Sequence, residues 1–464
     1  MSSQFANKVV NVVGLGATGL SLVRYLHARG AALRVFDGSE NPNGLAQLAS
    51  EFPAVSYMRH DVMRDRLPAC DMIALSPGVP RASLVVREAL KTGTEVVGDI
   101  ELFAREVSSA REVFAITGSN GKTTTTAIAG ELAKTVDAHA IVAGNIGIPI
   151  LDALDAHPDA KTWVLELSSF QLESTTSLTP RNAVMLNVSA NHLDRYPSLF
   201  QYAKTKATIY EGAQQQVINR DDLWSNAMRR TDVKSTSFGL NTPASYEDTG
   251  VSQPASFAQL VHRGDIVIDI EKMRLRGNHN VMNAMAAIAL MQPLGVTLDA
   301  CRGVLMSFAG VAHRYQWMGR VAGIDVINDS KATTVVATTA ALRGNSAVTW
   351  LIAGGDGKGQ SFDDLAAAAA TRCCAVHLIG RDALHIAQAL EARGVPHRMF
   401  TTIEDATAAA LDSAKPGDLL LLSPACASWD MFRNFEHRAS AFMSAVQAWA
   451  HARGVVVEGV VNHA

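Results

Sequence analysis

This sequence lacks the features of a disulfide-linked protein, of a polyanion-binding protein and of a membrane protein. Its 464 residues include five cysteines at scattered positions, which fits neither a disulfide framework nor a CxxC metal site. The 41 Lys and Arg are balanced by 44 Asp and Glu, which predicts no nucleic acid partner. It has no signal-peptide pattern at its start, and no uncharged apolar run approaches the roughly 18 residues of a membrane span. We expect a cytoplasmic protein without membrane insertion, and a monomer.

What the sequence does contain is a regular alternation of short β-branched apolar runs and longer helix-like stretches. This pattern is typical of α/β domains with mainly parallel sheets. Most runs end in a small or polar residue, which places that residue at the carboxyl end of a strand, where such sheets bind ligands. The predicted strands cover residues 9–13, 33–36, 72–75, 113–117, 163–167, 183–188, 348–353, 375–379 and 419–422.

The chain length suggests about three domains. A first boundary is expected after the Gly98-Asp99 pair, and a second before a strand-turn-strand pattern at residues 316–328. Residues 234–271 are polar and are predicted to be an irregular excursion within the second domain, because a helical pattern returns at 278–290. The expected domains are residues 1–101, 102–312 and 313–464.

The clearest functional signal is Gly-Ser-Asn-Gly-Lys-Thr at residues 118–123, between a predicted strand and a helix. Glycines let backbone N–H groups approach a phosphate, and the helix offers its positive end. Lys122 would neutralise the β- and γ-phosphates of ATP, and the Thr123 hydroxyl could bind Mg²⁺. The spacing is two residues shorter than the common P-loop, and an ordinary glycine turn is the alternative. The residues predicted to hold ATP are Gly118, Ser119, Asn120, Gly121, Lys122, Thr123 and Thr124.

A second glycine signature, Gly-Leu-Gly-Ala-Thr-Gly, occupies residues 14–19, and Asp37 ends the next predicted strand. This spacing matches the dinucleotide fingerprint with its ribose-binding acid. Alone it would suggest an NAD-dependent dehydrogenase, although the same geometry serves any nucleotide diphosphate. A tight turn without ligand is the third interpretation.

Glu166 and His192 follow two further predicted strands and could complete a divalent-metal site beside the phosphate loop. From the residues alone, a capping acid and a loop histidine are the better interpretations, and Lys206 would be a solvated lysine. Three loops at 328–333, 354–358 and 423–428 each follow a strand. Their lysines and hydroxyls could form a carboxylate-binding pocket or be unrelated polar turns.

Together these motifs resemble the Mur ligase family, the ATP-dependent amide-forming enzymes of bacterial cell-wall precursor synthesis, and within it the members that add D-glutamate. The resemblance covers essentially the whole chain, and several motifs in the right order are more specific than any one of them. It rests on residues 118–123, 144–147, 166–173, 192–197, 313–314, 328–333, 354–358 and 423–435.

The resemblance implies a Rossmann-like N-terminal domain for a UDP sugar, a central P-loop-type ATPase domain and a Rossmann-like C-terminal domain for an amino acid. The implied reaction joins D-glutamate to UDP-N-acetylmuramoyl-L-alanine with ATP, through an acyl phosphate. The residues implied for the UDP-sugar peptide are Leu15, Ala17, Thr18, Asp37, Gly78, Asn145 and His192. Those implied for glutamate are Lys331, Thr333, Lys358, Ser428 and Phe435.

For ATP the resemblance adds Asn280, His313, Arg314 and Asp329, and it implies catalytic roles for Lys122, His192, Lys206 and Arg314. It implies two Mg²⁺ ions held by Thr123, Glu166, His192 and Lys206. In this family a lysine at the place of Lys206 is carbamylated by CO2, which turns a cation into a carboxylate. Lys204 is the near alternative.

The sequence departs from the family pattern at a few places. Ala190 and Asn191 stand where an acidic pair is usual, which weakens the negative potential near the metals; Thr334 stands in place of a common asparagine and Trp429 in place of a frequent leucine. Three rival functions remain: another member of the same ligase superfamily, a nicotinamide-dependent oxidoreductase and a non-catalytic nucleotide-binding regulator.

Overall fold

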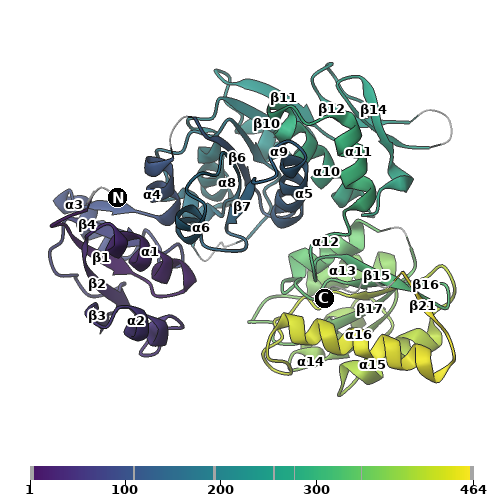
Figure 1. The fold of residues 1–464 in the computed structure, drawn as a ribbon. Coiled ribbons are helices and arrows are strands. Elements are labelled where there is room, and N and C mark those ends of the chain that lie inside the picture. Colours follow the sequence, from purple (N-terminus) through teal and green to yellow (C-terminus); the bar gives the residue numbers. More distant parts are fainter. Residues whose placement is uncertain are drawn as a thin grey trace. The chain divides into compact units, whose positions relative to one another are not determined.

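A computed structural model describes residues 5–107, 110–191, 195–253, 257–275, 277–345 and 347–459. The chain divides into two compact units, each considered by itself. The first contains the described residues up to Asp269 together with Asn283–Val304; the second contains Ile270–Met282 and the described residues from Leu305. Three sheets make up the fold (Figure 1). Among the described residues, none of the helices is long and apolar enough to cross a membrane.

The N-terminal sheet has five parallel strands in the order β3-β2-β1-β4-β5. Its order reverses between β1 and β4, and ligands of such sheets bind at this switch point. The strands are β1 (Val9–Val13), β2 (Ala32–Asp37), β3 (Ser56–Arg59), β4 (Met72–Leu75) and β5 (Glu95–Val97). The helices are α1 (Ala17–Ala28), α2 (Leu45–Glu51), α3 (Leu84–Thr92) and α4 (Asp99–Glu106).

The central sheet has nine strands in the order β14-β13-β12-β11-β10-β9-β6-β8-β7. They are β6 (Glu112–Thr117), β7 (Ile141–Gly144), β8 (Thr162–Glu166), β9 (Asn182–Met185), β10 (Gln215–Asn219), β11 (Lys234–Phe238), β12 (Thr249–Ser252), β13 (Gln259–His262) and β14 (Asp265–Asp269). The helices are α5 (Lys122–Lys134), α6 (Ile150–Ala156), α7 (Ser169–Leu172), α8 (Leu199–Ala207), α9 (Leu223–Ala227), α10 (Asn278–Met291) and α11 (Leu298–Ser307). Three short 3₁₀ turns cover Thr208–Tyr210, Ile270–Lys272 and Gln292–Leu294.

The prediction of irregular structure over residues 234–271 was wrong. This segment supplies β11 to β14, and β12 pairs with β13 and β13 with β14 in antiparallel fashion. Strands β11 and β12 are rich in Ser, Thr and Gly, and β13 and β14 hold apolar runs of only two or three residues, so the segment lacks the longer apolar runs by which the other strands were found. The prediction that the segment belongs with the second domain agrees with the sheet, because β11 pairs with β10.

The second unit holds a seven-stranded sheet in the order β19-β18-β17-β20-β16-β15-β21. The strands are β15 (Gln316–Val321), β16 (Ile324–Asn328), β17 (Thr349–Gly354), β18 (Cys373–Ile379), β19 (His397–Met399), β20 (Leu419–Leu422) and β21 (Val457–Glu458). Strands β16 to β20 run parallel, whereas β15 is antiparallel to both its neighbours. The helices are α12 (Val335–Arg343), α13 (Asp363–Arg372), α14 (Ala383–Glu391), α15 (Ile403–Ser413) and α16 (Phe435–Ala452).

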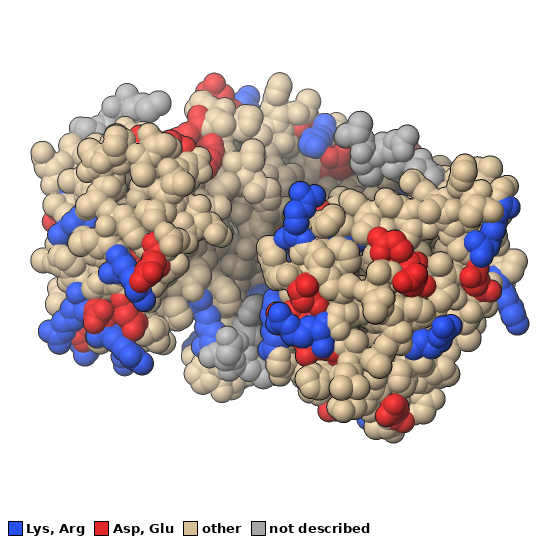
Figure 2. All heavy atoms as spheres, turned by 90° about the horizontal axis from the view of Figure 1, so that it is seen from below, with Lys and Arg blue, Asp and Glu red and all other residues tan. Residues whose placement is uncertain are grey.

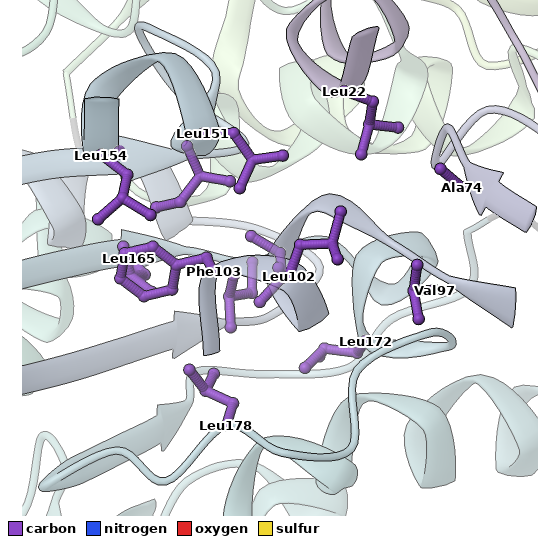
Figure 3. Packing of buried hydrophobic residues seen from close by; sticks show 14 of the residues in the cluster. Leu22, Ala74, Val97, Leu102, Phe103, Leu151, Leu154, Leu165, Leu172 and Leu178 are labelled. Atoms are coloured by element: carbon purple, nitrogen blue, oxygen red, sulfur yellow. The ribbon is translucent and has the colours of Figure 1, made fainter. Parts of the chain in front are cut away.

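One continuous apolar core runs through the first unit, from the N-terminal sheet into the central sheet. Helix α4 lies between them, and Figure 3 shows its side chains Leu102 and Phe103 among residues of both sheets. The rings of Phe103 and Trp163 meet edge to face, with centroids 5.1 Å apart. On the face drawn in Figure 2, most of the surface is uncharged and the Lys and Arg side chains lie among Asp and Glu.

Candidate active site

The phosphate loop lies where predicted, between the end of β6 and the start of α5. Gly121 is the N-cap of α5 with a left-handed φ of 81°, and a Cβ there would stand 2.3 Å from Oδ1 of Asn283. Glycine is therefore required for both conformation and space. The N-cap residue Gly121 has no side chain with which to cap the first turn of α5, so the N–H groups of that turn can bind an anion. Lys122 Nζ donates to the carbonyls of Gly118 (2.9 Å) and Ser119 (3.1 Å).

Two asparagines brace this loop, and sequence reasoning missed both. Asn187, just after β9, accepts from the backbone N–H of Asn120 (2.9 Å) and donates to its carbonyl (3.1 Å). Asn283 on α10 accepts from the Thr125 hydroxyl (3.3 Å). The backbone N–H of Ser119 also donates, to the Asn187 carbonyl. The N–H groups of Ser119 and Asn120 are thus occupied by protein acceptors, which leaves the phosphate-facing backbone to residues from Gly121 onward.

Lys206 lies buried behind the loop, with 1% of its surface exposed. It comes from the last turn of α8, which Ser198 caps. Its Nζ donates to the Thr117 hydroxyl (3.5 Å) and lies 4.7 Å from the centroid of the Tyr202 ring. Within the described residues, no carboxylate forms an ion pair with it. Lys204 on the same helix is exposed.

Burial holds the pKa of Lys206 well below its ordinary value, and the nearby Lys122 ammonium lowers it further, against a smaller opposite effect of Glu166. The neutral amine is the favoured form, because the cation would be desolvated beside a like charge. A neutral lysine amine is a nucleophile. The interpretation of Lys206 as a solvated surface lysine does not hold.

Glu166 ends β8, the neighbour of β6 in the sheet, and is 2% exposed. Its Oε1 accepts from the Asn145 side-chain amide (2.9 Å), whereas its Oε2 is buried and accepts no hydrogen bond from any described residue. Glu166 does not cap a helix, because Ser168 caps α7. A buried carboxylate oxygen with no protein donor is a ligand of the kind that Mg²⁺ takes.

The structure describes three of the four predicted metal ligands. In the part of the chain that the structure describes, no group of three or more His, Cys, Asp and Glu side chains is placed so that it could hold a metal ion. Of the predicted ligands, Thr123 lies in the first turn of α5 and Glu166 and Lys206 lie near it, while His192 is outside the described residues.

The N-terminal glycine loop also joins a strand to a helix, but its N-cap Gly16 is extended and its side-chain partner differs. The backbone N–H of Leu15 donates to Oδ2 of Asp37 (2.7 Å), and Ser39 N–H donates to its Oδ1 (2.8 Å). The loop and the turn at Gly78 follow β1 and β4, which flank the switch point of the sheet. Ala17 and Gly78 are exposed, Thr18 is half-buried and Leu15 is buried. The structure thus brings the predicted UDP-sugar residues of this domain to one edge, with Asn145 instead beside Glu166.

In the second unit, three loops meet at the carboxyl ends of the adjacent strands β16, β20 and β17. Asp329 accepts from the Ser423 hydroxyl (2.7 Å) and the Tyr315 N–H (3.0 Å), and burial raises its pKa to about 7. Lys331 Nζ lies 3.7 Å from the centroid of the Phe435 ring. Burial and the nearby Arg314 lower the pKa of Lys331. Asp329, predicted for ATP, and Lys331, predicted for glutamate, therefore share one loop, and Phe435 at the start of α16 packs against it.

Arg438 holds these loops together, and no sequence signal pointed to it. It is fully buried and donates to the hydroxyl and carbonyl of Ser330 (3.1 and 2.9 Å) and to the Cys426 carbonyl (3.1 Å). Ser428, predicted for glutamate, is buried next to this loop. Burying a guanidinium costs free energy unless it is hydrogen-bonded. The three hydrogen bonds of Arg438 therefore fix the positions of the loops at Ser330 and Cys426.

Several non-glycine residues of this unit adopt left-handed backbone conformations, which concentrate at functional sites. They are His313 (φ 63°), Tyr315 (φ 44°), Ala322 (φ 48°), Lys358 (φ 53°) and Ala425 (φ 60°).

The remaining predicted residues of this unit lie as follows. His313 Nδ1 bonds with the Asn328 amide (3.0 Å), and the His313 carbonyl accepts from Lys331 N–H. Lys358 N–H donates to Asp356. Thr333 lies directly before the Thr334 cap of α12, and Asn280 is buried in α10.

Comparison with known proteins agrees with this geometry. Models for the Mur ligase MurD-like N-terminal domain, the Mur ligase middle domain and the Mur ligase glutamate ligase domain match residues 8–98, 116–291 and 313–426. The UDP-N-acetylmuramoylalanine--D-glutamate ligase of Methylobacillus flagellatus is 44% identical over 443 residues, or 96% of this chain and 97% of that protein. The ligase of the same name from Chromobacterium violaceum is 44% identical over 454 residues, or 97% of this chain and 99% of that protein.

This chain belongs to the Mur ligase family. Among solved structures, a pseudomurein peptide ligase type C from Methanothermus fervidus has a TM-score of 0.59 at 18% identity, covering 95% of this chain and 100% of that one. That likeness shows the fold. As a Mur ligase, the chain is an ATP-dependent amide-forming enzyme, and ATP with Mg²⁺ are the family's cofactors. The predicted fold class of three α/β domains and the predicted family are confirmed.

Proposed function

We propose that this enzyme ligates D-glutamate to UDP-N-acetylmuramoyl-L-alanine with ATP, in the synthesis of peptidoglycan precursors. The observation that carries the proposal is the full-length similarity, at 44% identity, to ligases named for this reaction. The N-terminal switch point, the phosphate loop and the loops around Lys331 offer separate places for a nucleotide sugar, ATP and a dicarboxylate.

The proposed chemistry has two steps. The free carboxylate of the UDP-sugar peptide attacks the γ-phosphate of ATP, which forms an acyl phosphate and releases ADP. The amine of glutamate then attacks the acyl carbon, and inorganic phosphate leaves as the amide forms. Direct condensation would require oxide as a leaving group, whereas phosphate is a far better one.

Lys122 is proposed to neutralise the γ-phosphate during transfer, because it is the first residue of the helix whose N-terminus would face the phosphates. Thr123, Glu166, His192 and a carbamylated Lys206 are proposed to hold two Mg²⁺ ions, which would neutralise phosphate charge. The uncapped helix end and the unpartnered Oε2 of Glu166 fit these groups. Arg314, Asp329, Asn280 and His313 remain the proposed ATP residues of the second unit.

The carbamate is supported by the surroundings of Lys206. Its buried amine has a lowered pKa and lies near both Lys122 and Glu166. Adding CO2 to the neutral amine releases a proton and gives an anion, which attracts the Lys122 ammonium, whereas a protonated Lys206 would repel it. Exposed Lys204 has no such surroundings, which favours Lys206 as the site.

For glutamate, Lys331, Thr333 and Lys358 are proposed to pair with its carboxylates, with Ser428 and Phe435 completing the pocket. We also propose the domain boundaries 1–101, 102–312 and 313–464. The cytoplasmic location and the monomeric state stay predictions.

Phosphate release tests the proposal. With ATP and Mg²⁺, it should require both UDP-N-acetylmuramoyl-L-alanine and D-glutamate. L-Glutamate, glycine, lysine and diaminopimelate, each tested in place of D-glutamate, should give little phosphate. Release with another amine instead would assign the chain to a different member of the family, and no release with any amine would contradict the proposed reaction.

A further inference from the structure

Two largely enclosed arginines join the N-terminal sheet's elements to those of the central sheet. Arg29, after α1, is 8% exposed and pairs with Glu106 (2.9 Å) and Asp155 (2.8 Å). Arg195, before α8, is 9% exposed and pairs with Glu173 (2.7 Å). Both are therefore arginines held at the same junction by carboxylates. They differ in what else they contact.

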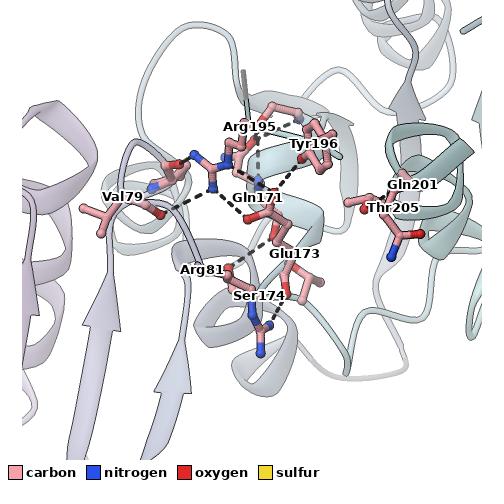
Figure 4. Close-up of polar contacts among 12 residues, drawn as sticks. Val79, Arg81, Gln171, Glu173, Ser174, Arg195, Tyr196, Gln201 and Thr205 are labelled. Carbon is pink, nitrogen blue, oxygen red and sulfur yellow. Dashed lines mark hydrogen bonds and ion pairs between the residues drawn. The ribbon is translucent and has the colours of Figure 1, made fainter. Parts of the chain in front are cut away.

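Arg195 uses its remaining donors on the turn that follows β4. Its Nη1 donates to the Pro77 carbonyl (2.9 Å) and its Nη2 to the Val79 carbonyl (3.3 Å). These two carbonyls flank Gly78, which is exposed and has open space around its Cα. Figure 4 shows the guanidinium between Glu173 and Val79. One side chain of the central sheet thus clamps both sides of Gly78.

The clamped turn belongs to the N-terminal ligand edge. Val79 N–H donates to the Ser76 carbonyl (3.0 Å), which closes the turn. A Cβ on Gly14 would stand 2.7 Å from Ser76 Cβ and 3.1 Å from Val79 Cγ2. The turn therefore packs directly against the first residue of the N-terminal glycine loop, and a shift of one moves the other.

The guanidinium itself is fixed from three sides. Its Nε and Nη2 bond both carboxylate oxygens of Glu173 (3.2 and 2.7 Å), a bidentate pairing that sets its plane. Glu173 also accepts from the Tyr196 hydroxyl (2.6 Å), and the guanidinium lies 3.9 Å from the centroid of the Phe170 ring. Lysine could supply the charge but not this planar fork.

We propose that Arg195 is a positioning residue of the nucleotide-sugar site. Held by Glu173 and Tyr196, it fixes the turn at Gly78 against the N-terminal glycine loop, and so sets the affinity for the UDP-sugar substrate from the neighbouring domain. This inference rests on the proposed function, which assigns the UDP sugar to that edge.

Calorimetric titration of UDP-N-acetylmuramoyl-L-alanine into the full chain and its variants tests the inference. Arg195→Lys loses two carbonyl contacts, so its Kd for the UDP sugar should rise on the order of tenfold. Tyr196→Phe removes only one hydroxyl that steadies Glu173 and should raise the Kd on the order of threefold. In steady state both should raise the KM for the UDP sugar by these factors, while kcat at saturation and the Kd for ADP stay within about twofold.

Arg29→Lys is the matched control, because it weakens a buried pairing at the same junction that does not touch the turn. It should lower the melting temperature and leave the Kd for the UDP sugar unchanged. An unchanged Kd in Tyr196→Phe and Arg195→Lys, with only a lower melting temperature, would overturn the inference while leaving the proposed function intact; so would an equal rise in Arg29→Lys. Failure of the unaltered protein to bind the UDP sugar would overturn both.

Discussion

The two glycine loops of the first unit share a backbone plan but hold opposite charges beside it. Each follows the carboxyl end of a parallel strand and leads into a helix. Beside the N-terminal loop stands the carboxylate of Asp37, which accepts from the backbone of the loop. In the central loop stands Lys122, with Lys206 and Glu166 buried behind it.

We infer from this comparison that glycine spacing alone does not determine which ligand a loop binds. The glycines permit close approach and left-handed turns in both loops. An acid beside the loop suits the hydroxyls of a nucleoside, whereas a lysine with a carboxylate and metal ligands suits a reacting triphosphate. A search for glycine spacing would treat the two loops alike, and the neighbouring side chains separate them.

Removing the positive charge of Lys122 from the central loop should have the largest effect on activity. Lys122→Ala should lower kcat by roughly 10³-fold, because a positioned donor to the transferring phosphate is lost. Steady-state phosphate release measures it. Lys134→Ala changes an exposed lysine at the other end of α5 and should leave kcat unchanged; an equal loss in this control would show that helix stability, and not the phosphate contact, was measured.

Lys206→Ala should come next, with a loss of roughly 10²-fold, as a metal ligand and its carbamate disappear. Lys204→Ala on the same helix should keep its activity. In ¹³C NMR with labelled bicarbonate, a carbamate signal should be present in the unaltered chain and in Lys204→Ala, and absent in Lys206→Ala. A signal that disappears in Lys204→Ala instead would move the modification to that residue.

In the N-terminal glycine loop, stability should fall most where an added Cβ would collide with the backbone. A Cβ on Gly19 would stand 1.9 Å from the Gly14 carbonyl oxygen, whereas a Cβ on Gly16 would meet nothing within 4 Å. Gly19→Ala should therefore destabilise the chain by about 2 kcal/mol, and Gly16→Ala by about 0.5 kcal/mol at most. Thermal unfolding compares them, and equal melting temperatures for the two variants would contradict the close packing.

The smallest expected effect is on the melting temperature and concerns Asp99, the first residue of α4, between the two sheets that carry the glycine loops. Burial raises the pKa of Asp99 from near 3.8 to about 6, although Gln171 donates to one of its oxygens (3.0 Å). A raised acid pKa means that stability is present at low pH and is lost as pH rises through about 6. The melting temperature of Asp99→Asn relative to the unaltered chain should rise between pH 4 and pH 6 and then level off. A flat difference would show that Asp99 titrates normally.

Much of the fold followed from the sequence. Strands such as β4 and β20 coincide with the predicted apolar runs at residues 72–75 and 419–422, because fully buried parallel strands are continuous apolar segments. Strands β11 to β14 were missed, because a segment such as Thr249–Ser252 has little apolar character. The place of β12 in the sheet comes from backbone pairing with its neighbours β11 and β13, which residue type alone does not predict.

The sequence predicted those parts of the candidate site that lie within a recognisable motif. Gly121, Lys122 and Glu166 lie where the motifs implied. The side chains that brace the loops, Asn187 at the phosphate loop and Arg438 at the loops of the second unit, were not predictable, because their roles depend on contacts between distant segments. Arg195 belongs to a recognised motif, yet its contact with the turn at Gly78 appears only in the folded chain.

The most direct test of the central claim is a crossed titration of two variants by calorimetry. Lys122→Ala and Asp37→Ala are each titrated with a non-hydrolysable ATP analogue and with UDP-N-acetylmuramoyl-L-alanine. We expect Lys122→Ala to lose affinity for the ATP analogue only, and Asp37→Ala to lose affinity for the UDP sugar only, each on the order of tenfold or more. If both variants lost the same ligand, or if the losses were exchanged, the assignment of the two loops would be contradicted.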